Sequence, residues 1–266
     1  MSKIIFITGS TDGIGKLAAI MLAKEGHHVH VHGRNQEKLD TTLSEVKSQS
    51  GNEHVYGWLA DFSDLSVVKQ TANEINSQLP KLDVLINNAG VFNSAVTEDK
   101  NGIDIRFTVN YLAPFLLTHT LLPTIQKSEA GRIINLGSAA QAPVSLPDLE
   151  GGRNLSDQSA YAQSKLAITM WTLHLAGTLK NTSAIVVNPG SLLDTKMAVE
   201  AFGQVWSPAE KGADILRNLA VADNYAGMTG KYYDNDRGGF GRAHPDAYDV
   251  NKINALLKVS EQLLLK

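Results

Sequence analysis

Two residues near the middle of the chain have the spacing that proton-transfer chemistry requires. Tyr161 and Lys165 are four positions apart, so on a helix their phenol and ammonium would share one face. A free tyrosine has a pKa of about 10, and proton transfer near neutral pH requires lowering that pKa by roughly 3 units, or about 4 kcal/mol. One lysine charge at ~4 Å in an effective dielectric of ~20 is worth about as much. The pair is therefore a candidate general acid/base.

The same spacing recurs at Tyr248 and Lys252, and an isolated pair of this kind usually lies on a solvent-facing helix. Context distinguishes the two pairs. Tyr161 comes after an apolar strand pattern that ends in Ser138 and before an apolar run that leads to Pro189. Tyr248 lies in a polar C-terminal segment without such partners, so Tyr161 is the favoured candidate.

A glycine-rich turn follows the first apolar run of the chain. Gly9, Gly13 and Gly15 stand between a predicted strand and a predicted helix. Glycines let a backbone turn tightly and approach a pyrophosphate, while a helix N-terminus offers amide donors and positive potential. The spacing differs from the usual Gly-x-Gly-x-x-Gly pattern, and glycines also cap helices. The strand-turn-helix setting nevertheless favours dinucleotide binding.

The residues after the second predicted strand bear on which dinucleotide is bound. Gly33 and Arg34 stand where an acidic side chain would bind the ribose hydroxyls of NAD. A small residue leaves room for a 2'-phosphate and an arginine can hold it, so NADP is favoured over NAD. The alternative is a solvated loop arginine. Asp12 opposes the NADP reading, because an acid in the phosphate turn would repel the ligand.

Four histidines surround this strand, at positions 27, 28, 30 and 32. Three of them alternate along the strand and share one face, but no carboxylate or cysteine set accompanies them. No metal site is expected.

Short β-branched runs alternate with longer helical patterns along the whole chain. The predicted strands are Ile4–Thr8, Val29–His32, Val55–Leu59, Leu82–Asn87, Arg132–Gly137, Ala184–Asn188 and Thr229–Tyr233. This alternation predicts a single-domain, doubly wound α/β fold of the Rossmann type, with a seven-stranded parallel sheet and helices on both faces. Two segments that follow strands, 142–158 and 191–206, are candidate substrate loops.

Bulk composition excludes several classes of protein. The chain has 266 residues, a formal net charge of -3 and no cysteine. These values give no basic footprint for nucleic acid, no disulfides and no thiol catalysis. No apolar stretch approaches ~18 residues, and the short apolar run after Lys3 is too brief for a signal peptide. We expect a cytoplasmic protein without a membrane span.

Taken together, these motifs resemble the short-chain dehydrogenase/reductase family over nearly the whole chain, and most closely its retinol-dehydrogenase-like members. The motifs that carry the resemblance are Thr8–Gly15, Asp61-Phe62, Asn87–Gly90, Val109-Asn110, Ser138, Tyr161–Lys165, Pro189-Gly190 and Thr229–Tyr233.

The resemblance implies a role for each motif. Tyr161 would be the general acid/base, Lys165 would lower its pKa and hold the nicotinamide ribose, Ser138 would bind the substrate oxygen, and Asn110 would order a water chain. The implied cofactor-binding residues are Gly9, Thr11, Gly13, Ile14, Gly15, Arg34, Asp61, Phe62, Asn88, Ala89, Gly90, Tyr161, Lys165, Pro189 and Gly190.

The implied reaction is hydride transfer between the nicotinamide of NADP and an alcohol or carbonyl substrate. The apolar residues of 191–206, among them Phe202 and Trp206, would cover a lipophilic substrate or pack on the protein itself. The apolar faces expected around 101–127 and 159–179 would pair across a twofold axis in a homodimer or homotetramer, although burial within one chain would explain the same residues.

Two departures from the family pattern and two other functions stay open. Ser138 and Tyr161 are 23 positions apart (161 − 138), with the excess at 146–158, and Asp194 stands where the family places a threonine, one residue before Thr195.

An NADP-sensing regulatory protein would need the glycine turn but not the catalytic set. An epimerase or dehydratase would need a larger C-terminal domain than the 76 residues after Gly190 (266 − 190).

Overall fold

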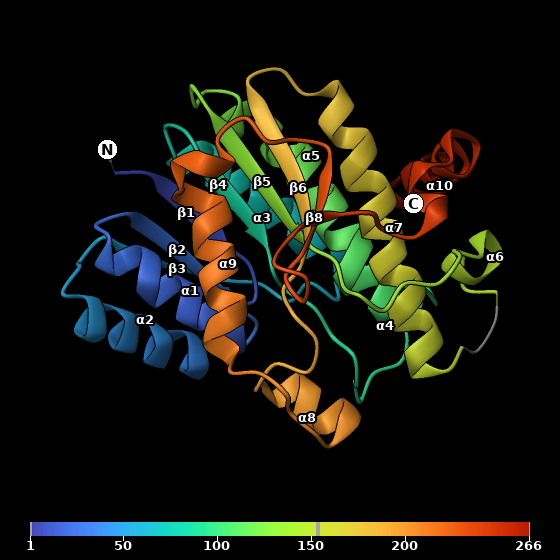
Figure 1. The fold of residues 1–266 in the computed structure, drawn as a ribbon, viewed down its shortest axis with the longest axis horizontal. Helices are drawn as coiled ribbons and strands as arrows, with labels where there is room; N and C mark the ends of the chain where they lie inside the picture. The colour runs from blue at the N-terminus through green and yellow to red at the C-terminus, as the bar shows by residue number, and fades with distance from the viewer. Residues whose placement is uncertain (1, 153–154, 266) are drawn as a thin grey trace.

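The computed structural model describes residues 2–152 and 155–265, apart from the side chain of Phe202 (Figure 1). The described residues form one eight-stranded sheet of order β3-β2-β1-β4-β5-β6-β7-β8. The strands are β1 (Ile4–Ile7), β2 (His28–Gly33), β3 (Val55–Leu59), β4 (Val84–Asn87), β5 (Gly131–Leu136), β6 (Thr182–Asn188), β7 (Lys231–Asp234) and β8 (Gly239–Gly241).

The predicted doubly wound α/β fold is confirmed, and all seven predicted strands are found, with ends shifted by at most two residues. Strands β1 to β7 are parallel, whereas β8 pairs antiparallel with β7. The sequence pattern missed β8 because its three residues are Gly239, Phe240 and Gly241, which show no strand periodicity.

The helices are α1 (Gly13–Lys24), α2 (Gln36–Ser50), α3 (Leu65–Gln78), α4 (Ile105–Phe107), α5 (Ala113–Ile125), α6 (Leu146–Leu149), α7 (Asp157–Thr178), α8 (Lys196–Phe202), α9 (Ala209–Val221) and α10 (Val250–Leu264). A π-helical turn, Thr108–Leu112, joins α4 to α5, and short 3₁₀ turns lie at Asp223–Tyr225 and Pro245–Tyr248. Helices α1, α2 and α9 cover one face of the sheet, while α3, α5 and α7 cover the other (Figure 1).

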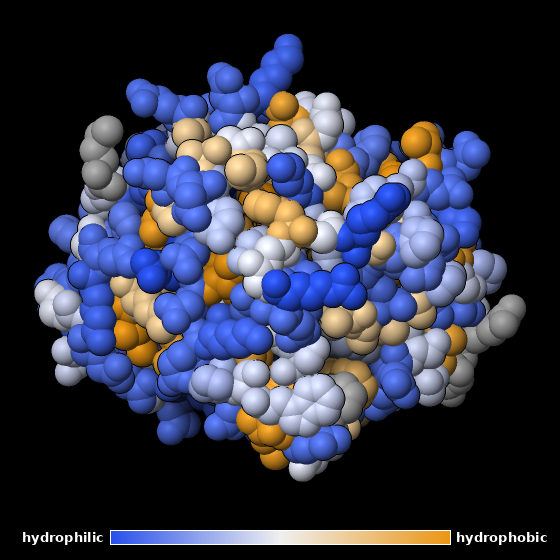
Figure 2. Space-filling model, viewed as in Figure 1, coloured by the Kyte–Doolittle hydropathy of each residue, from blue (hydrophilic) through white to orange (hydrophobic). Residues whose placement is uncertain are grey.

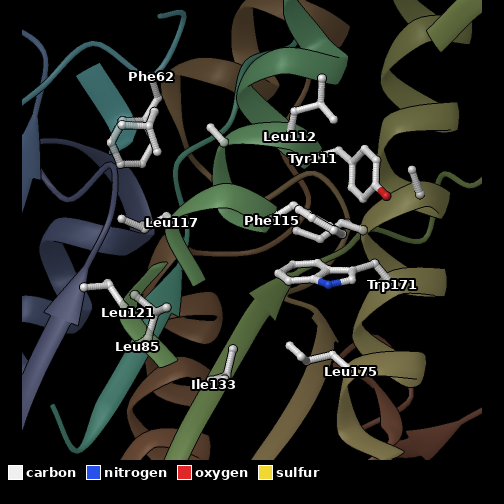
Figure 3. Packing of buried hydrophobic residues seen from close by; sticks show 14 of the residues in the cluster. Phe62, Leu85, Tyr111, Leu112, Phe115, Leu117, Leu121, Ile133, Trp171 and Leu175 are labelled. Atoms are coloured by element: carbon white, nitrogen blue, oxygen red, sulfur yellow. The ribbon is translucent and has the colours of Figure 1, made fainter. Parts of the chain in front are cut away.

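Each face of the sheet has its own apolar core. The larger core lies under α3, α5 and α7, where Phe115, Leu121, Ile133 and Trp171 pack together (Figure 3). Helix α10 adds Leu256 to this core, and the phenol of Tyr111 hydrogen-bonds the Ser260 hydroxyl at 2.7 Å. The C-terminal helix therefore packs on the helices that the sequence assigned to a symmetric interface.

The order of the strands determines where a ligand can bind. From the neighbouring strands β1 and β4 the chain winds in opposite directions, toward β3 on one side and toward β7 on the other. In open parallel sheets the crevice at such a reversal, beyond the carboxyl ends of the strands, is the usual ligand site. The glycine-rich turn follows β1 and Asn88 follows β4, so both lie at this crevice.

Candidate active site

The glycine-rich turn packs directly on the loop that follows β4. Gly9 and Gly13 have positive φ angles of 61° and 53°, in the left-handed region that favours glycine. A Cβ atom on Gly9 would lie 2.6 Å from the Ala89 Cα, and one on Gly15 would lie 2.4 Å from the Asn88 amide nitrogen. The Asn88 amide donates to the carbonyls of Thr8 and Gly9 at 2.8 Å each. Only glycine fits these positions, which leaves a narrow cradle at the start of α1 for a pyrophosphate.

His32 supports the same turn from beneath. Its Nδ1 accepts a hydrogen bond from the Gly9 amide at 2.9 Å, and its Nε2 lies 3.1 Å from the Ala60 carbonyl. Because a carbonyl only accepts, Nε2 carries the proton and the ring is neutral. Burial lowers the pKa of His32 to about 4. The sequence pattern assigned His32 to a strand but gave no sign of this contact, which joins residues 23 positions apart.

Asp12 has a structural reason to stand in the phosphate turn. It is the N-cap of α1, and its carboxylate accepts from the Gly13 amide at 2.8 Å. A carboxylate at a helix N-terminus satisfies an otherwise unpaired amide. Asp12, whose negative charge is unfavourable beside a phosphate, therefore has the structural role of capping α1.

Gly33, which is predicted to make room for a 2'-phosphate, also has a packing role. A Cβ atom on Gly33 would lie 2.4 Å from the Thr11 Cγ2, so this glycine is needed for packing against Thr11. Arg34 is exposed, and in the described part of the chain its side chain has no hydrogen bond or ion pair. A nearby cavity of about 410 Å³, between the starts of α1 and α2, is lined by Thr11, Asn35 and Lys38 among others.

The predicted adenine-side residues follow β3. The buried ring of Phe62 stacks against His32 with a centroid distance of 4.1 Å. The exposed Asp61 carboxylate accepts from the Ser63 amide at 2.9 Å, which shapes the turn. Phe62 and the glycine turn are therefore both held by His32.

Asn110 lies in the π-helical turn between α4 and α5, an irregularity frequent at functional sites. Its Oδ1 accepts from the Val91 amide at 2.8 Å, and its Nδ2 donates to the Val91 carbonyl and the Ser164 hydroxyl at 3.0 Å each. Both amide protons of Asn110 are thus engaged. One lone pair of its oxygen is left for the water that the resemblance implies.

The predicted pair of Tyr161 and Lys165 shares one face of α7. The Lys165 ammonium lies 5.6 Å from the centre of the Tyr161 ring and donates to the Leu136 carbonyl at 2.8 Å. Burial lowers the pKa of Lys165 to about 8. Gly90 lies against Lys165 and Asn110, since a Cβ atom there would be 3.3 Å from the Asn110 oxygen and 3.7 Å from the Lys165 nitrogen.

The expected lowering of the Tyr161 pKa by Lys165 is not found in the structure. Burial raises the pKa of Tyr161 above its ordinary value, and a hydrogen bond with Ser138 partly offsets this effect. The physical reason is that desolvation disfavours the charged forms of both residues. The hydrogen bond brings the hydroxyls of Ser138 and Tyr161 together.

The loop after Pro189 is fixed to the turn between β7 and β8. The Asp236 carboxylate accepts from the Ser191 amide at 2.8 Å and from the Ser191 hydroxyl at 2.6 Å, and it also accepts from Asn188. Asp236 was missed by sequence reasoning because it lies 45 positions from Ser191 in an irregular segment. The Ser191 hydroxyl is engaged by this contact rather than directed at a ligand.

Thr195 reaches the phosphate turn despite its one-residue offset. Its methyl Cγ2 lies 3.5 Å from the position of a Cβ atom on Gly13, and its hydroxyl caps α8 by accepting from the Ala198 amide. Backbone hydrogen bonds of 2.8 Å join Trp206 to Leu192 and Asp194 to Ser207. The two ends of the loop 191–206 are therefore hydrogen-bonded to each other.

The other candidate loop, 142–158, begins along α7. The Ala142 amide donates to the Ala162 carbonyl at 3.2 Å, and the Ser145 amide donates to the Gln163 side chain at 2.9 Å. Its start is therefore beside Tyr161. Residues 153–154 of this loop lie outside the described residues.

The second Tyr-x-x-x-Lys pair does not form a site. Tyr248 ends a 3₁₀ turn and Lys252 lies in α10, so the two are not on one helix. Lys252 forms an ion pair of 2.8 Å with Asp246, and the Tyr248 hydroxyl accepts from the Ala243 amide. Tyr161 and Lys165 are therefore the pair of this spacing that lies on one helix, and their catalytic role stays a prediction.

Two kinds of feature, a membrane-spanning helix and a metal-binding cluster, are absent from the described residues. None of the helices in 2–152 and 155–265 is long and apolar enough to cross a membrane. Within the same ranges, no group of three or more histidine, cysteine, aspartate or glutamate residues is placed to hold a metal ion.

Comparison with known proteins assigns the class. The family model for short chain dehydrogenases matches residues 3–205. The chain therefore belongs to the short-chain dehydrogenase/reductase family and is an NAD(P)-dependent oxidoreductase, as the motifs predicted. The glycine cradle at the start of α1 and the adjoining Asn88-Ala89 fit the dinucleotide that this family uses.

Among individual proteins, the chain is 32% identical over 243 residues to mouse retinol dehydrogenase 12, covering 87% of this chain and 77% of that one. It is 31% identical over 255 residues to human polyprenol dehydrogenase, covering 88% and 77%. The crystal structure of a short chain dehydrogenase from Escherichia coli CFT073 in complex with NADPH matches with a TM-score of 0.73 and 28% identity, covering 88% of this chain and 96% of that one.

Proposed function

We propose that this enzyme transfers hydride between NADP and a lipophilic alcohol or carbonyl compound. The observation that carries the proposal is the convergence of four groups beside the glycine cradle. Asn110 and Lys165 both lie against Gly90, and Tyr161 is bonded to Ser138. These side chains come from the π-helical turn, the end of β5 and α7, which meet only in the folded chain.

The proposed roles follow from the positions of the side chains. The nicotinamide, when bound, supplies the hydride chemistry. The hydroxyls of Ser138 and Tyr161 together hold the substrate oxygen, and Tyr161 gives or takes its proton. Lys165, whose pKa burial lowers to about 8, would hold the nicotinamide ribose as the resemblance implies. Asn110 keeps the Val91 backbone in place and leaves one lone pair for an ordered water.

The choice of NADP is supported by charge and by similarity. Arg34 is exposed beside the start of α2 and is free of ion pairs among the described residues, and Lys38 lines the adjacent cavity. Guanidinium and ammonium groups are the usual partners of a 2'-phosphate. The bound NADPH of the related Escherichia coli structure agrees with this choice.

The choice of a lipophilic substrate is supported by the surface of 191–206. Leu193 is buried against Gly190 and Gly212, but Met197, Val205 and Trp206 are exposed, Trp206 by 70%. Figure 2 shows apolar residues among polar ones at the α8 edge of the molecule. Phe202 is also predicted to cover the substrate from the loop 191–206, but its side chain lies outside the described residues. The names of the retinol and polyprenol dehydrogenases agree with a lipophilic substrate.

A panel of ketones and alcohols of graded chain length, followed by NADPH absorbance, tests the proposal. Turnover should rise with chain length, and Tyr161→Phe should lower it by ~100-fold or more because the proton carrier is lost. The dissociation constant for NADPH should stay within about twofold of wild type, since the phenol is a small part of the cofactor contact.

The matched control is Tyr248→Phe, which removes a phenol from the other Tyr-x-x-x-Lys pair and should leave turnover unchanged. Equal losses in the two variants would contradict the assignment of Tyr161. NADPH binding without turnover on any member of the panel would instead favour a sensor.

A further inference from the structure

Arg106 is a charged residue inside the protein. It belongs to α4, and its side chain is 1% exposed. A buried guanidinium is costly unless its donors are bonded and its charge is paired. Four positions later on the same helical face comes Asn110. The proposed catalytic residues do not account for a buried charge one turn away.

The guanidinium joins three separate segments of the chain. Its Nε donates to the Phe92 carbonyl at 2.8 Å, in the loop after β4. Its Nη1 lies 3.2 and 3.1 Å from the two carboxylate oxygens of Asp104, which begins α4. Its Nη2 forms an ion pair with Asp157, the first residue of α7. Arg106 therefore ties the helix of Tyr161 to the loop after β4.

This loop is held against Tyr161. Asn110 binds both the amide and the carbonyl of Val91, and Arg106 binds the carbonyl of Phe92. The Phe92 ring packs on the Tyr161 ring, with 4.8 Å between centroids and a 50° angle between planes. Asn110 and Arg106, one helical turn apart, thus fix the consecutive residues Val91 and Phe92. The ring of Phe92 in turn contacts Tyr161.

We propose that Arg106 is a positioning residue for Tyr161, acting through the carbonyl of Phe92 and through Asp157. Rigid placement matters because a displacement of ~1 Å in a reacting group can cost ~100-fold in rate. A lysine at 106 would keep the charge but not the planar fork, which hydrogen-bonds Phe92 and Asp104 and also forms the ion pair with Asp157. The inference rests on the proposed role of Tyr161.

The test compares Arg106→Lys, Phe92→Leu and the double variant. Each single variant should lower kcat by about tenfold or more, while the dissociation constant for NADPH changes less than about twofold, because Arg106 acts on Tyr161 and not on the cofactor. The pH profile of kcat should shift, since the surroundings of the Tyr161 phenol change. The double variant should lose little more than the worse single variant, as expected for residues acting in one chain of contacts.

Arg217→Lys is the matched control. Arg217 forms ion pairs with Glu25 and Asp214 on the outside of α9, and the same substitution there should leave kcat and its pH profile unchanged. If Arg106→Lys fails to fold, Asp157→Asn replaces it, because Asp157 is 51% exposed and tolerates the change more easily. Asp157→Asn should reproduce the loss in kcat.

A readout without turnover separates this proposal from the proposed function. In protein labelled with 3-fluorotyrosine, the fluorine resonance that disappears in Tyr161→Phe belongs to Tyr161, and Arg106→Lys should move it. If that resonance and kcat both match the wild type in folded Arg106→Lys, the positioning role is overturned. If the losses of Arg106→Lys and Phe92→Leu multiply, the path through Phe92 is overturned. If Tyr161→Phe keeps full turnover, the proposed function fails, whatever the resonance does.

Discussion

At the scale of single residues, two residues in the cofactor region have structural roles that their types did not suggest. Asp12 looked unfavourable beside a phosphate, yet its carboxylate caps the helix whose amides would face that phosphate. Gly33 is predicted to leave space for a 2'-phosphate, and its missing Cβ also accommodates Thr11. At the end of β2, Arg34 is therefore the residue whose charge favours NADP over NAD.

Arg34→Ala tests that preference. The dissociation constant for NADPH should rise about tenfold or more, because a charged hydrogen-bond partner of the 2'-phosphate is lost, and that for NADH should stay the same. Titration of intrinsic fluorescence with each cofactor measures both constants. Arg242→Ala, which removes an arginine that packs on Tyr248, is the control. Tighter binding of NADH than NADPH by the unmodified protein would refute the NADP assignment.

At the scale of elements, α10 changes what the apolar faces of α5 and α7 imply. The sequence predicted that these faces pair in a homodimer or homotetramer, and the structure of one chain does not test the oligomeric state. It does show α10 lying on α7 and bonded to the π-helical turn before α5, with Leu256 fully buried and the Ser260 hydroxyl bonded to Tyr111. Burial within one chain therefore explains the residues that α10 covers, which favours a single chain over the predicted homodimer or homotetramer.

We accordingly expect light scattering at micromolar concentration to give the mass of a single chain, 28.7 kDa. Leu256→Glu places an unpaired charge in the core and should release α10, so that the mass rises with concentration as the uncovered faces associate. Val250→Glu on the same helix, at a residue 67% exposed, should leave the mass unchanged. A wild-type mass of two or four chains would restore the original prediction.

At the scale of the whole molecule, β2 makes folding stability sensitive to acid. Burial lowers the pKa values of His30 and His32 to about 4, below the value of 6.5 expected when the chain is unfolded. The unfolded chain then binds more protons between pH 6.5 and 4. The stabilisation is complete above pH 6.5 and is lost as the pH falls toward 4, by roughly 3 kcal/mol for each histidine.

Urea denaturation at several pH values between 7 and 4.5 measures this effect. His30→Gln and His32→Gln should each flatten the fall in the free energy of unfolding, because glutamine can accept the same hydrogen bonds without titrating in this range. His54→Gln, at an exposed position directly before β3, is the control. If the free energy of unfolding of these variants falls with pH as steeply as that of the wild type, groups other than His30 and His32 cause the acid sensitivity.

Local patterns in the sequence were enough to predict the fold and the helix that carries the candidate pair. Strand and helix periods identified β1 to β7, the glycine spacing identified the cradle, and Tyr161 and Lys165 lie one turn apart on a single helix. Such features depend on neighbours within a few residues, where backbone geometry determines which side chains meet.

Contacts between distant segments were decided by the tertiary structure alone. The bonds from Gly9 to His32, from Ser191 to Asp236 and from Tyr111 to Ser260 span 23, 45 and 149 positions. Burial also set the pKa of Tyr161, which the spacing to Lys165 had predicted with the wrong sign. Both effects arise from packing: desolvation and long-range hydrogen bonds depend on which elements cover a group, and a residue's neighbours in sequence do not contain that information.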